Sequence, residues 1–280
     1  MPPNDARAMR HARRDEFLRS IAAGPTIMGV LNITPDSFSD GGRYQTPDAA
    51  AAQARLMADT GAAIIDVGAE STRPGHTPLA PDVEWARLER VLPHLIRTVE
   101  APFSIDTSKA SVARRALGFG VAAVNDVWGL QRDPQMAPLV AEAQAALVIM
   151  HNRESVDAHL DILDDIRRFF DRSLALARAA GIDDRHILLD PGIGFGKTTE
   201  QNLVALRSIS SLAAYGLPLL VGVSRKSLLG RLLGAEVGDR LVGSLAAHLA
   251  AVSRGAGVLR VHDVGAHRAA LNVWQAIARA

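Results

Sequence analysis

Residues 63–66 read Ala63-Ile64-Ile65-Asp66, a short apolar run that ends in a polar residue. The same pattern occurs eight times, with about 33 residues on average between run ends, and one strand–helix unit of a parallel barrel takes about 30 residues. The runs and the polar residues that end them are Ile27–Leu31 with Asn32, Ala63–Ile65 with Asp66, Phe103–Ile105 with Asp106, Ala122–Val124 with Asn125, Leu147–Met150 with His151, Ile187–Leu189 with Asp190, Leu219–Val223 with Ser224, and Val258–Val261 with His262. The sequence therefore predicts a single-domain α/β fold, a (β/α)8 TIM barrel over residues 26–280.

The segments between the runs have the period of amphipathic helices. Apolar residues recur at steps of three and four over residues 85–99 and again over residues 162–174, which places them on one helix face. The alternative fold is an open doubly wound sheet, which needs a glycine-rich first turn of the G-x-G-x-x-G kind. The first turn here is Asn32-Ile33-Thr34-Pro35-Asp36. That turn contains no such glycines, so the sequence favours the barrel.

The composition excludes several classes of function. Hydrophobic residues make up 48% of the chain and charged residues 22%, and the net charge is only +1. This balance argues against nucleic-acid binding through a basic surface, and no run approaches the ~20 apolar residues that span a bilayer. The absence of cysteine excludes disulfides, a thiolate nucleophile, iron–sulfur clusters and cysteine zinc sites. We expect a cytoplasmic protein with no nucleic-acid or membrane partner.

Residues 1–25 have a different character from the rest of the chain. They are polar and basic and have no apolar signal core. The basic residues are Arg7, Arg10, Arg13 and Arg14, and Asp5, Asp15 and Glu16 interrupt them. The acidic residues weaken the interpretation as a transit peptide. We interpret residues 1–25 as a polar N-terminal leader that is frayed.

The polar residues at the run ends indicate where function lies. In parallel barrels the active site is built at the carboxyl ends of the strands. Those ends supply Asn32, Asp66, Asp106, Asn125, His151, Asp190, Ser224, Arg260 and His262. Any single one of them is equally well explained as a strand end or a helix cap. Nine together, arginine and histidine included, predict a functional site.

Three of these residues suggest a ligand. Asp106, Asn125 and Asp190 would converge from three strands, and acceptors and an amide at one place suit a flat heterocycle with N–H donors on its edge. A cluster of metal ligands is the alternative, although a divalent site normally uses more than two well-placed carboxylates. Residues 190–198 are not a nucleotide phosphate loop, because that motif needs glycine where Pro191 stands.

Other segments carry groups that suit anions. Ser224-Arg225-Lys226-Ser227 follows the seventh run and opens a helix, where an anion or a carbonyl oxygen can bind. Arg260 and His262 stand two residues apart on the last strand, so both side chains lie on the same side. Two long loops, residues 33–46 and 68–80, have the length of active-site lids. The second loop includes Ser71-Thr72-Arg73-Pro74-Gly75, a further candidate anion clamp.

Seven segments match the signatures of one known family. They are Gly29–Gly42, Ile65–Gly75, Ser104–Lys109, Asn125–Val127, Leu189–Lys197, Ser224–Ser227 and Arg260–Val264. In these segments the sequence resembles dihydropteroate synthases, and the resemblance covers about residues 26–280. One departure is the fifth loop, where Asn152-Arg153-Glu154 follows Met150-His151 in place of the family's methionine and nearby glycine.

The resemblance implies a reaction and a role for each matched residue. The reaction joins 6-hydroxymethyl-7,8-dihydropterin diphosphate to p-aminobenzoate and yields 7,8-dihydropteroate and diphosphate, a step of folate synthesis. By this resemblance Asp106, Asn125, Asp190 and Lys226 hold the pterin, Thr72, Arg73, Arg260 and His262 serve the diphosphate, Ser224 and Phe195 border the p-aminobenzoate position, and Asn32 helps to bind Mg2+. Among them Asp106, Asp190, Lys226 and Arg260 are the expected catalytic residues.

The resemblance also implies a homodimer formed through the later helices. The apolar residues Leu271, Val273, Trp274 and Ile277 permit this arrangement, and they equally permit packing on the barrel.

Two alternative functions stay open. A non-catalytic pterin-binding homologue would be expected to lose lid or anion-binding residues. A methyltransferase-like domain that passes a methyl group from methyltetrahydrofolate to a corrinoid would not need Ser224–Ser227 or the pair of Arg260 and His262.

Overall fold

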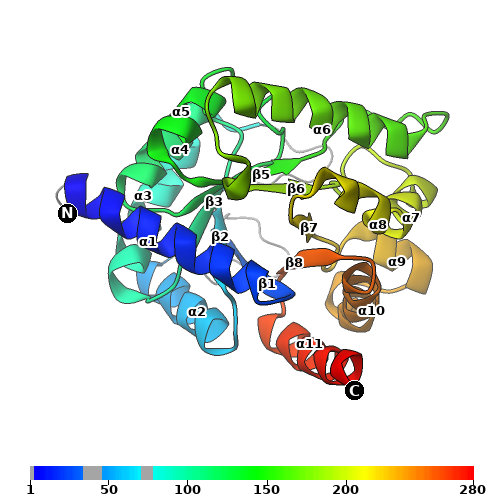
Figure 1. Cartoon of the computed structure of the whole chain (residues 1–280). Helices are drawn as coiled ribbons and strands as arrows, with labels where there is room; N and C mark the ends of the chain where they lie inside the picture. The colour runs from blue at the N-terminus through cyan, green and yellow to red at the C-terminus, as the bar shows by residue number, and fades with distance from the viewer. Residues whose placement is uncertain (1–2, 34–45, 71–77) are drawn as a thin grey trace.

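The described strands form one closed barrel. The computed structural model describes residues 3–33, 46–70 and 78–280, and its strands follow one another around the barrel in chain order, from β1 to β8 (Figure 1). Every neighbouring pair, including β8 with β1, is parallel. All carboxyl ends therefore meet at one rim. The predicted single-domain TIM barrel is confirmed, and the open doubly wound sheet is wrong.

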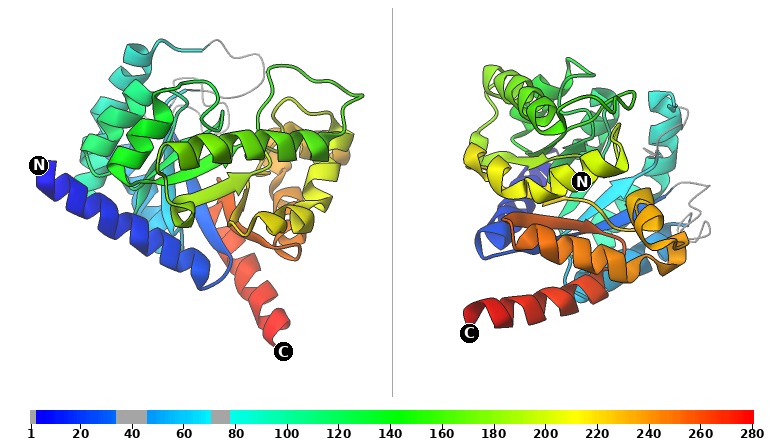
Figure 2. Two further views of the ribbon diagram at one scale, coloured as in Figure 1. Left: turned by 45° about the horizontal axis from the view of Figure 1, so that its top comes forward. Right: turned by 90° about the vertical axis from the view of Figure 1, so that its right-hand side faces the viewer.

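Helices surround the barrel on the outside (Figure 2). The strands are β1 (Thr26–Asn32), β2 (Ile64–Gly68), β3 (Phe103–Asp106), β4 (Ala123–Asp126), β5 (Ala146–Met150), β6 (Ile187–Asp190), β7 (Leu219–Val221) and β8 (Ala256–Val261). The helices are α1 (Pro3–Ala22), α2 (Pro47–Asp59), α3 (Pro81–Thr98), α4 (Ala110–Gly118), α5 (Met136–Ala143), α6 (Ile162–Ala179), α7 (Thr199–Arg207), α8 (Ile209–Leu212), α9 (Ser227–Leu233), α10 (Leu241–Val252) and α11 (Val264–Arg279). Each predicted apolar run overlaps one strand, and the two segments predicted to be helical lie in α3 and α6.

The alternation of side chains along each strand divides the barrel interior into two layers. The lower layer is apolar and contains Met28, Ile64, Ala123, Ala146, Val148, Leu188, Leu220 and Val258. The residues that alternate with the inward-facing ones along each strand, such as Ile65 and Leu189, face outward and pack with the helices. Two residues after Ile64, Ala123, Leu188 and Val258 stand Asp66, Asn125, Asp190 and Arg260. The interior is therefore apolar at the bottom and polar at the mouth.

Helix α1 closes the bottom of the barrel. The side chain of Phe17 is fully buried and packs against the apolar lower layer, and α1 crosses the barrel in Figure 1. The guanidinium of Arg10 donates to the backbone oxygens of Leu117, at 2.7 Å, and Ala143, at 2.9 Å. These oxygens belong to the last turns of α4 and α5, and Leu117 O also accepts from the backbone N–H of Gly120 at 3.0 Å. The interpretation of this segment as a frayed leader is therefore wrong for residues 3–22, because Phe17 and Arg10 anchor it.

No helix among the described residues combines the length and the apolar character that crossing a bilayer requires.

The burial of Phe17 leads to a stability prediction. Phe17→Ala should lower the free energy of unfolding by about 3–5 kcal/mol, because truncation leaves a cavity at the base of the barrel. Arg19→Ala, an exposed change on the same helix, should alter it by less than about 0.5 kcal/mol. Urea unfolding of both variants measures the difference. Equal stabilities would show that α1 is not part of the core.

Candidate active site

The carboxylate of Asp66 is the centre of the polar layer. Strand β2 continues past Asp66 to Gly68, so Asp66 lies inside the barrel and not at the strand end where the sequence placed it. It is fully buried. Its Oδ1 accepts a hydrogen bond from Ser104 Oγ at 2.6 Å, and its Oδ2 accepts from Asn125 Nδ2 at 2.9 Å and from Arg260 Nε at 2.7 Å. One carboxylate thus connects β2 with β3, β4 and β8.

Arg260 carries the positive charge of this network. Its Nη2 donates to Asp106 Oδ2 at 2.7 Å, so one guanidinium bridges two buried carboxylates. Burial opposes the charge of Arg260, but Asp66 and Asp106 outweigh it and raise the pKa of the guanidinium. Burial and the negative charge of Asp66 together raise the pKa of Asp106 to about 7, against the effect of Arg260. Asp106 can therefore exchange a proton near neutral pH.

Two buried acceptors in the mouth lack a partner. Oδ1 of Asp106 and Oδ1 of Asn125 make no hydrogen bond with the residues that the structure describes. Asp190 is 3% exposed, and its Oδ1 accepts from the backbone N–H of Gly192 at 2.7 Å. Burial raises the pKa of Asp190, while Lys226 opposes this shift. Because native proteins rarely leave buried acceptors unpaired, these oxygens indicate a ligand that carries N–H donors.

Lys226 and Phe195 lie together beside these acceptors. The Nζ of Lys226 is 4.5 Å from the centroid of the Phe195 ring and also donates to the backbone oxygen of Ile193. Burial lowers the pKa of Lys226 to about 8, and Asp190 opposes the decrease. Across β7 and β8, Ser224 Oγ is 3.0 Å from His262 Nδ1. The predicted aminobenzoate and diphosphate residues are therefore neighbours of the predicted pterin residues.

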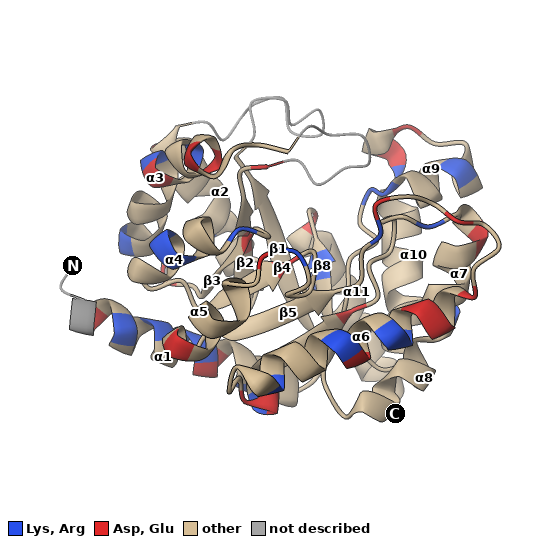
Figure 3. Ribbon diagram, turned by 90° about the horizontal axis from the view of Figure 1, so that it is seen from above, with Lys and Arg blue, Asp and Glu red and all other residues tan. Residues whose placement is uncertain are grey.

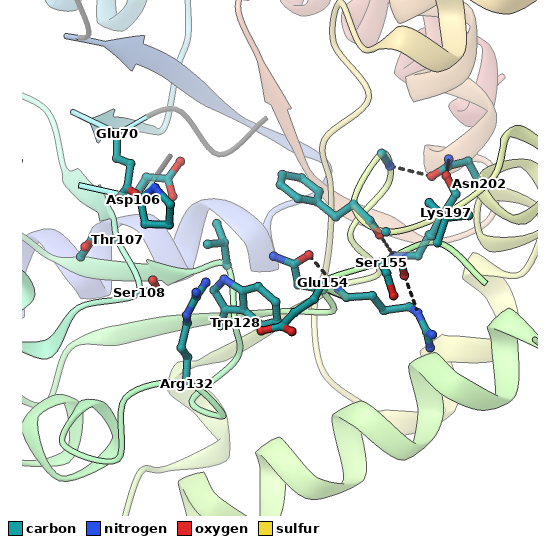
Figure 4. Close-up of a pocket in the computed structure, with 18 of the residues that line it drawn as sticks. Glu70, Asp106, Thr107, Ser108, Trp128, Arg132, Glu154, Ser155, Lys197 and Asn202 are labelled. Atoms are coloured by element: carbon teal, nitrogen blue, oxygen red, sulfur yellow. Dashed lines mark hydrogen bonds between the residues drawn. The ribbon is translucent and has the colours of Figure 1, made fainter. Parts of the chain in front are cut away.

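A cavity of about 730 Å³ opens at the mouth. It borders Asp106 on one side and extends past Trp128 to Phe195 and Lys197 (Figure 4). Seen from above, acidic and basic positions lie among the central strands (Figure 3). Cavities of about 300–1,000 Å³ are typical of small-molecule sites. The cavity therefore has the volume to hold a small charged ligand, and Asp106 connects it with the polar layer.

The remaining predicted residues have different outcomes. Asn32 ends β1, and a methyl group built on Gly68 would lie 3.7 Å from Asn32 Oδ1 and 3.6 Å from Asp106 Oδ2. Asn32 and Asp106 thus flank the same narrow gap. Thr72, Arg73 and most of both predicted lid loops lie outside the described residues. Within the described ranges no group of three or more histidines and acidic residues could hold a metal ion, so the alternative of a metal-ligand cluster gains no support there.

A second charged cluster was not predicted. The Nζ of Lys109 donates to Glu84 Oε2 at 2.6 Å and also to Glu70. Oε1 of Glu70 accepts from the backbone N–H of Leu79 at 3.0 Å. Glu70 therefore joins both ends of the second predicted lid loop and ties them to α3. The lysine stood in a matched segment, but nothing in the spacing of Glu70, Glu84 and Lys109 predicts that they meet.

The comparisons with known proteins agree with this site. Residues 28–262 match the model of the pterin binding enzyme family. A dihydropteroate synthase from Bacillus subtilis (strain 168) is 42% identical over 238 residues, which cover 85% of this chain and 83% of the relative. The chain thus belongs to the pterin-binding enzymes.

Solved structures narrow the assignment. A Clostridium difficile dihydropteroate synthase, determined in the presence of pteroic acid, matches with a TM-score of 0.87 at 44% identity over 92% of this chain and 98% of the other. A Xanthomonas albilineans dihydropteroate synthase in complex with 7,8-dihydropteroate matches with a TM-score of 0.84 at 40% identity over 92% and 95% of the two chains. The chain belongs to the dihydropteroate synthase family.

The contact between the two aspartates leads to a prediction about Asp106. Asp66→Asn preserves the shape of the side chain but removes the negative charge that helps to raise the pKa of Asp106. The pKa of Asp106 should therefore fall below its value of about 7 in the parent protein. Titration of the carboxyl carbons by 13C NMR measures it, with the exposed Asp184→Asn as a control. An unchanged or higher pKa would contradict the proposed coupling.

Proposed function

We propose that the chain catalyses the condensation of 6-hydroxymethyl-7,8-dihydropterin diphosphate with p-aminobenzoate, which forms 7,8-dihydropteroate and diphosphate. The chain is accordingly a transferase. The observation that carries this proposal is the pair of unpartnered buried acceptors on Asp106 and Asn125, beside the carboxylate of Asp190. The edge of a pterin presents N–H donors that would satisfy these oxygens. The family relationship supports the same substrate.

The reaction separates charge, and the polar layer suits that separation. The carbon–oxygen bond of the substrate breaks and its electron pair leaves with the diphosphate, while a carbon–nitrogen bond forms to the amine of p-aminobenzoate. The carboxylates of Asp106 and Asp190 stabilise positive charge that develops on the pterin. Lys226, beside Asp190, helps to hold the ring. Because no covalent intermediate is required, the absence of cysteine is compatible with the reaction.

The diphosphate lies toward β7 and β8 in this proposal. Asp66 and Asp106 engage two of the three guanidinium nitrogens of Arg260, so Nη1 is the nitrogen left for a diphosphate oxygen. His262 is the second group on this side, and Ser224 beside it borders the aminobenzoate position. Thr72 and Arg73, which match the family signature and lie outside the described residues, are the other residues proposed to bind the diphosphate.

Mg2+ is the proposed metal, and Asn32 is its proposed protein ligand. A carboxamide oxygen is a hard ligand, and Mg2+ is usually held by one or two protein groups together with substrate phosphates and water. Asn32 beside Asp106 fits this minimal protein contribution. When bound, Mg2+ would supply charge neutralisation for the diphosphate, and Asn32 would orient that end of the substrate near Asp106.

We also propose that the enzyme acts in the cytoplasm as a homodimer. On α11, Leu271 is fully buried against the barrel, whereas Val273 and Ile277 are 62% and 73% exposed. These two exposed apolar side chains support a second copy of the chain as the covering surface. Sedimentation equilibrium at micromolar concentration tests the dimer, which a mass near 29.8 kDa would contradict.

An assay of diphosphate release tests the function. Release should require both p-aminobenzoate and the dihydropterin diphosphate, because the leaving group departs as the new carbon–nitrogen bond forms. It should fall by at least about tenfold when Mg2+ is chelated, since the diphosphate then lacks its main charge partner. Pterin binding without release would favour the non-catalytic homologue. Methyl transfer from methyltetrahydrofolate to a corrinoid would favour the methyltransferase-like domain.

The role of Asp190 leads to a binding prediction. Asp190→Asn turns one acceptor oxygen into a donor that faces a pterin N–H, and a mismatched buried pair costs about 1–3 kcal/mol. Affinity for 6-hydroxymethylpterin should fall at least about tenfold, with the thermal unfolding midpoint nearly unchanged. Isothermal titration calorimetry measures it, with Asp184→Asn as the matched control. Parent-like affinity in the folded variant would remove Asp190 from the pterin site.

A further inference from the structure

Lys197 is a buried lysine to which the mechanism above gives no task. It is 6% exposed and lies in the segment that follows β6. Its Nζ is 2.7 Å from His151 Nδ1 and donates to the backbone oxygens of Gly192, at 2.8 Å, and Phe195, at 3.1 Å. Three acceptors surround the amino group. Burial lowers the pKa of Lys197, and these acceptors favour its protonated form, which has three N–H bonds to donate. Lys197 therefore links two parts of the loop 191–197 to each other and links the loop to His151, the residue that follows β5.

His151, the residue that follows β5, provides the anchor. It is fully buried, and its Nε2 is 3.0 Å from Asp165 Oδ2. Burial and the charge of Lys197 lower the pKa of His151 to about 3, so the ring is neutral. Nε2–H then donates to Asp165, and the lone pair of Nδ1 accepts from Lys197. Asp165 also accepts from Arg153 Nη1 at 2.8 Å. A chain of polar contacts thus connects the loop to α6.

The backbone of the loop leaves little room for another arrangement. Gly192 has a φ of +66°, and a Cβ there would lie 1.8 Å from the backbone oxygen of His151. Gly196 has a φ of +56°, and a Cβ there would lie 2.4 Å from Arg153 Cβ. In the middle of the loop, the backbone N–H of Gly194 donates to Asn202 Oδ1 at 2.6 Å. Figure 4 shows Asn202 beside Lys197. The loop is held at several points in one conformation.

We propose that Lys197 and His151 are positioning residues for the aminobenzoate substrate: they hold the loop so that the Phe195 ring forms one wall of that pocket. This inference rests on the proposed function, in which Phe195 borders p-aminobenzoate. The backbone oxygen of Phe195 is a direct partner of Lys197, and its ring contacts Lys226. Neither Lys197 nor His151 needs to touch a substrate to have this effect.

The effect should be selective for one substrate. Asp190, the proposed pterin acceptor, is the last residue of β6 and is paired in register with Met150 of β5. Its backbone oxygen also accepts from the N–H of His151 at 2.8 Å. These backbone bonds hold the main chain of Asp190 whether or not Lys197 is present, and the carboxylate of Asp190 meets the loop at Gly192, three residues before Phe195. Loss of Lys197 should therefore displace Phe195 more than Asp190.

The first test is Lys197→Met, which keeps the length of the side chain and removes its donors. The KM for p-aminobenzoate should rise at least about tenfold, because the loop carbonyls lose their buried partner. The KM for the dihydropterin diphosphate and the kcat at saturation should each change by less than about threefold. Steady-state kinetics with each substrate varied in turn measure the split. A variant that merely destabilised the fold would lower activity without this division.

A matched pair at His151 tests the same contact when Lys197→Met does not fold. The amide oxygen of asparagine can replace Nδ1 as the acceptor facing Lys197, whereas leucine has the same shape and no acceptor. Both His151→Asn and His151→Leu lose the contact with Asp165. Only His151→Leu should raise the KM for p-aminobenzoate by about tenfold, and His151→Asn should stay within about threefold of the parent enzyme.

Phe195→Ala separates the inference from the assignment beneath it. If Phe195→Ala raises the KM for p-aminobenzoate but folded Lys197→Met or His151→Leu does not, the positioning role is wrong and the proposed function stands. If Phe195→Ala leaves that KM unchanged, the assignment of Phe195 is wrong and the inference fails with it. Equal increases in the KM of both substrates would also overturn it, because the effect would not be confined to the loop.

Discussion

The mouth of this barrel depends on one partly buried guanidinium that bridges two buried carboxylates. Arg260 joins Asp66 and Asp106, and its positive charge favours the ionised form of Asp106 against the effect of burial. Asp66 in turn orients Ser104 and Asn125, so the acceptors of the mouth are fixed before any ligand arrives. Among the residues that the structure describes, one carboxylate oxygen of Asp106 and the amide oxygen of Asn125 have no hydrogen-bond partner. The stability of the network and its affinity for an N–H donor thus come from the same contacts.

The two layers of the barrel interior explain how the fold tolerates several charged side chains close together. The lower layer is built from apolar side chains and is sealed by Phe17. The polar layer begins one inward position later on the same strands. A strand can supply both layers because inward positions recur every second residue. Burial of the apolar lower layer therefore stabilises the fold and offsets the free-energy cost of burying charged groups in the layer above it.

The sequence predicted the barrel and the ring of polar strand ends because both follow from periodic patterns and chain spacing. Asp106, Asn125 and Asp190 were predicted from strand ends alone. Asp66 was placed at a strand end because the apolar run stops before it, but β2 continues to Gly68 and takes it inside. The sequence does not predict that α1 packs on the barrel. Basic residues dominate this segment, and Phe17 contacts lower-layer residues that are distant from it in sequence. Lys197 and His151 stand 46 residues apart, and no local pattern predicts that one bonds the other.

The seal formed by α1 has a consequence for the movement of molecules. A barrel that is closed below has one opening, so substrates, products and water all pass through the same mouth. The group bound deepest must enter before its partner and can leave only after it. In this chain Asp66 is fully buried in the polar layer, whereas Asp106 and Phe195 line the cavity that opens from the mouth. Because α1 closes the opposite end of the barrel, this single entrance sets the order in which substrates bind and products leave.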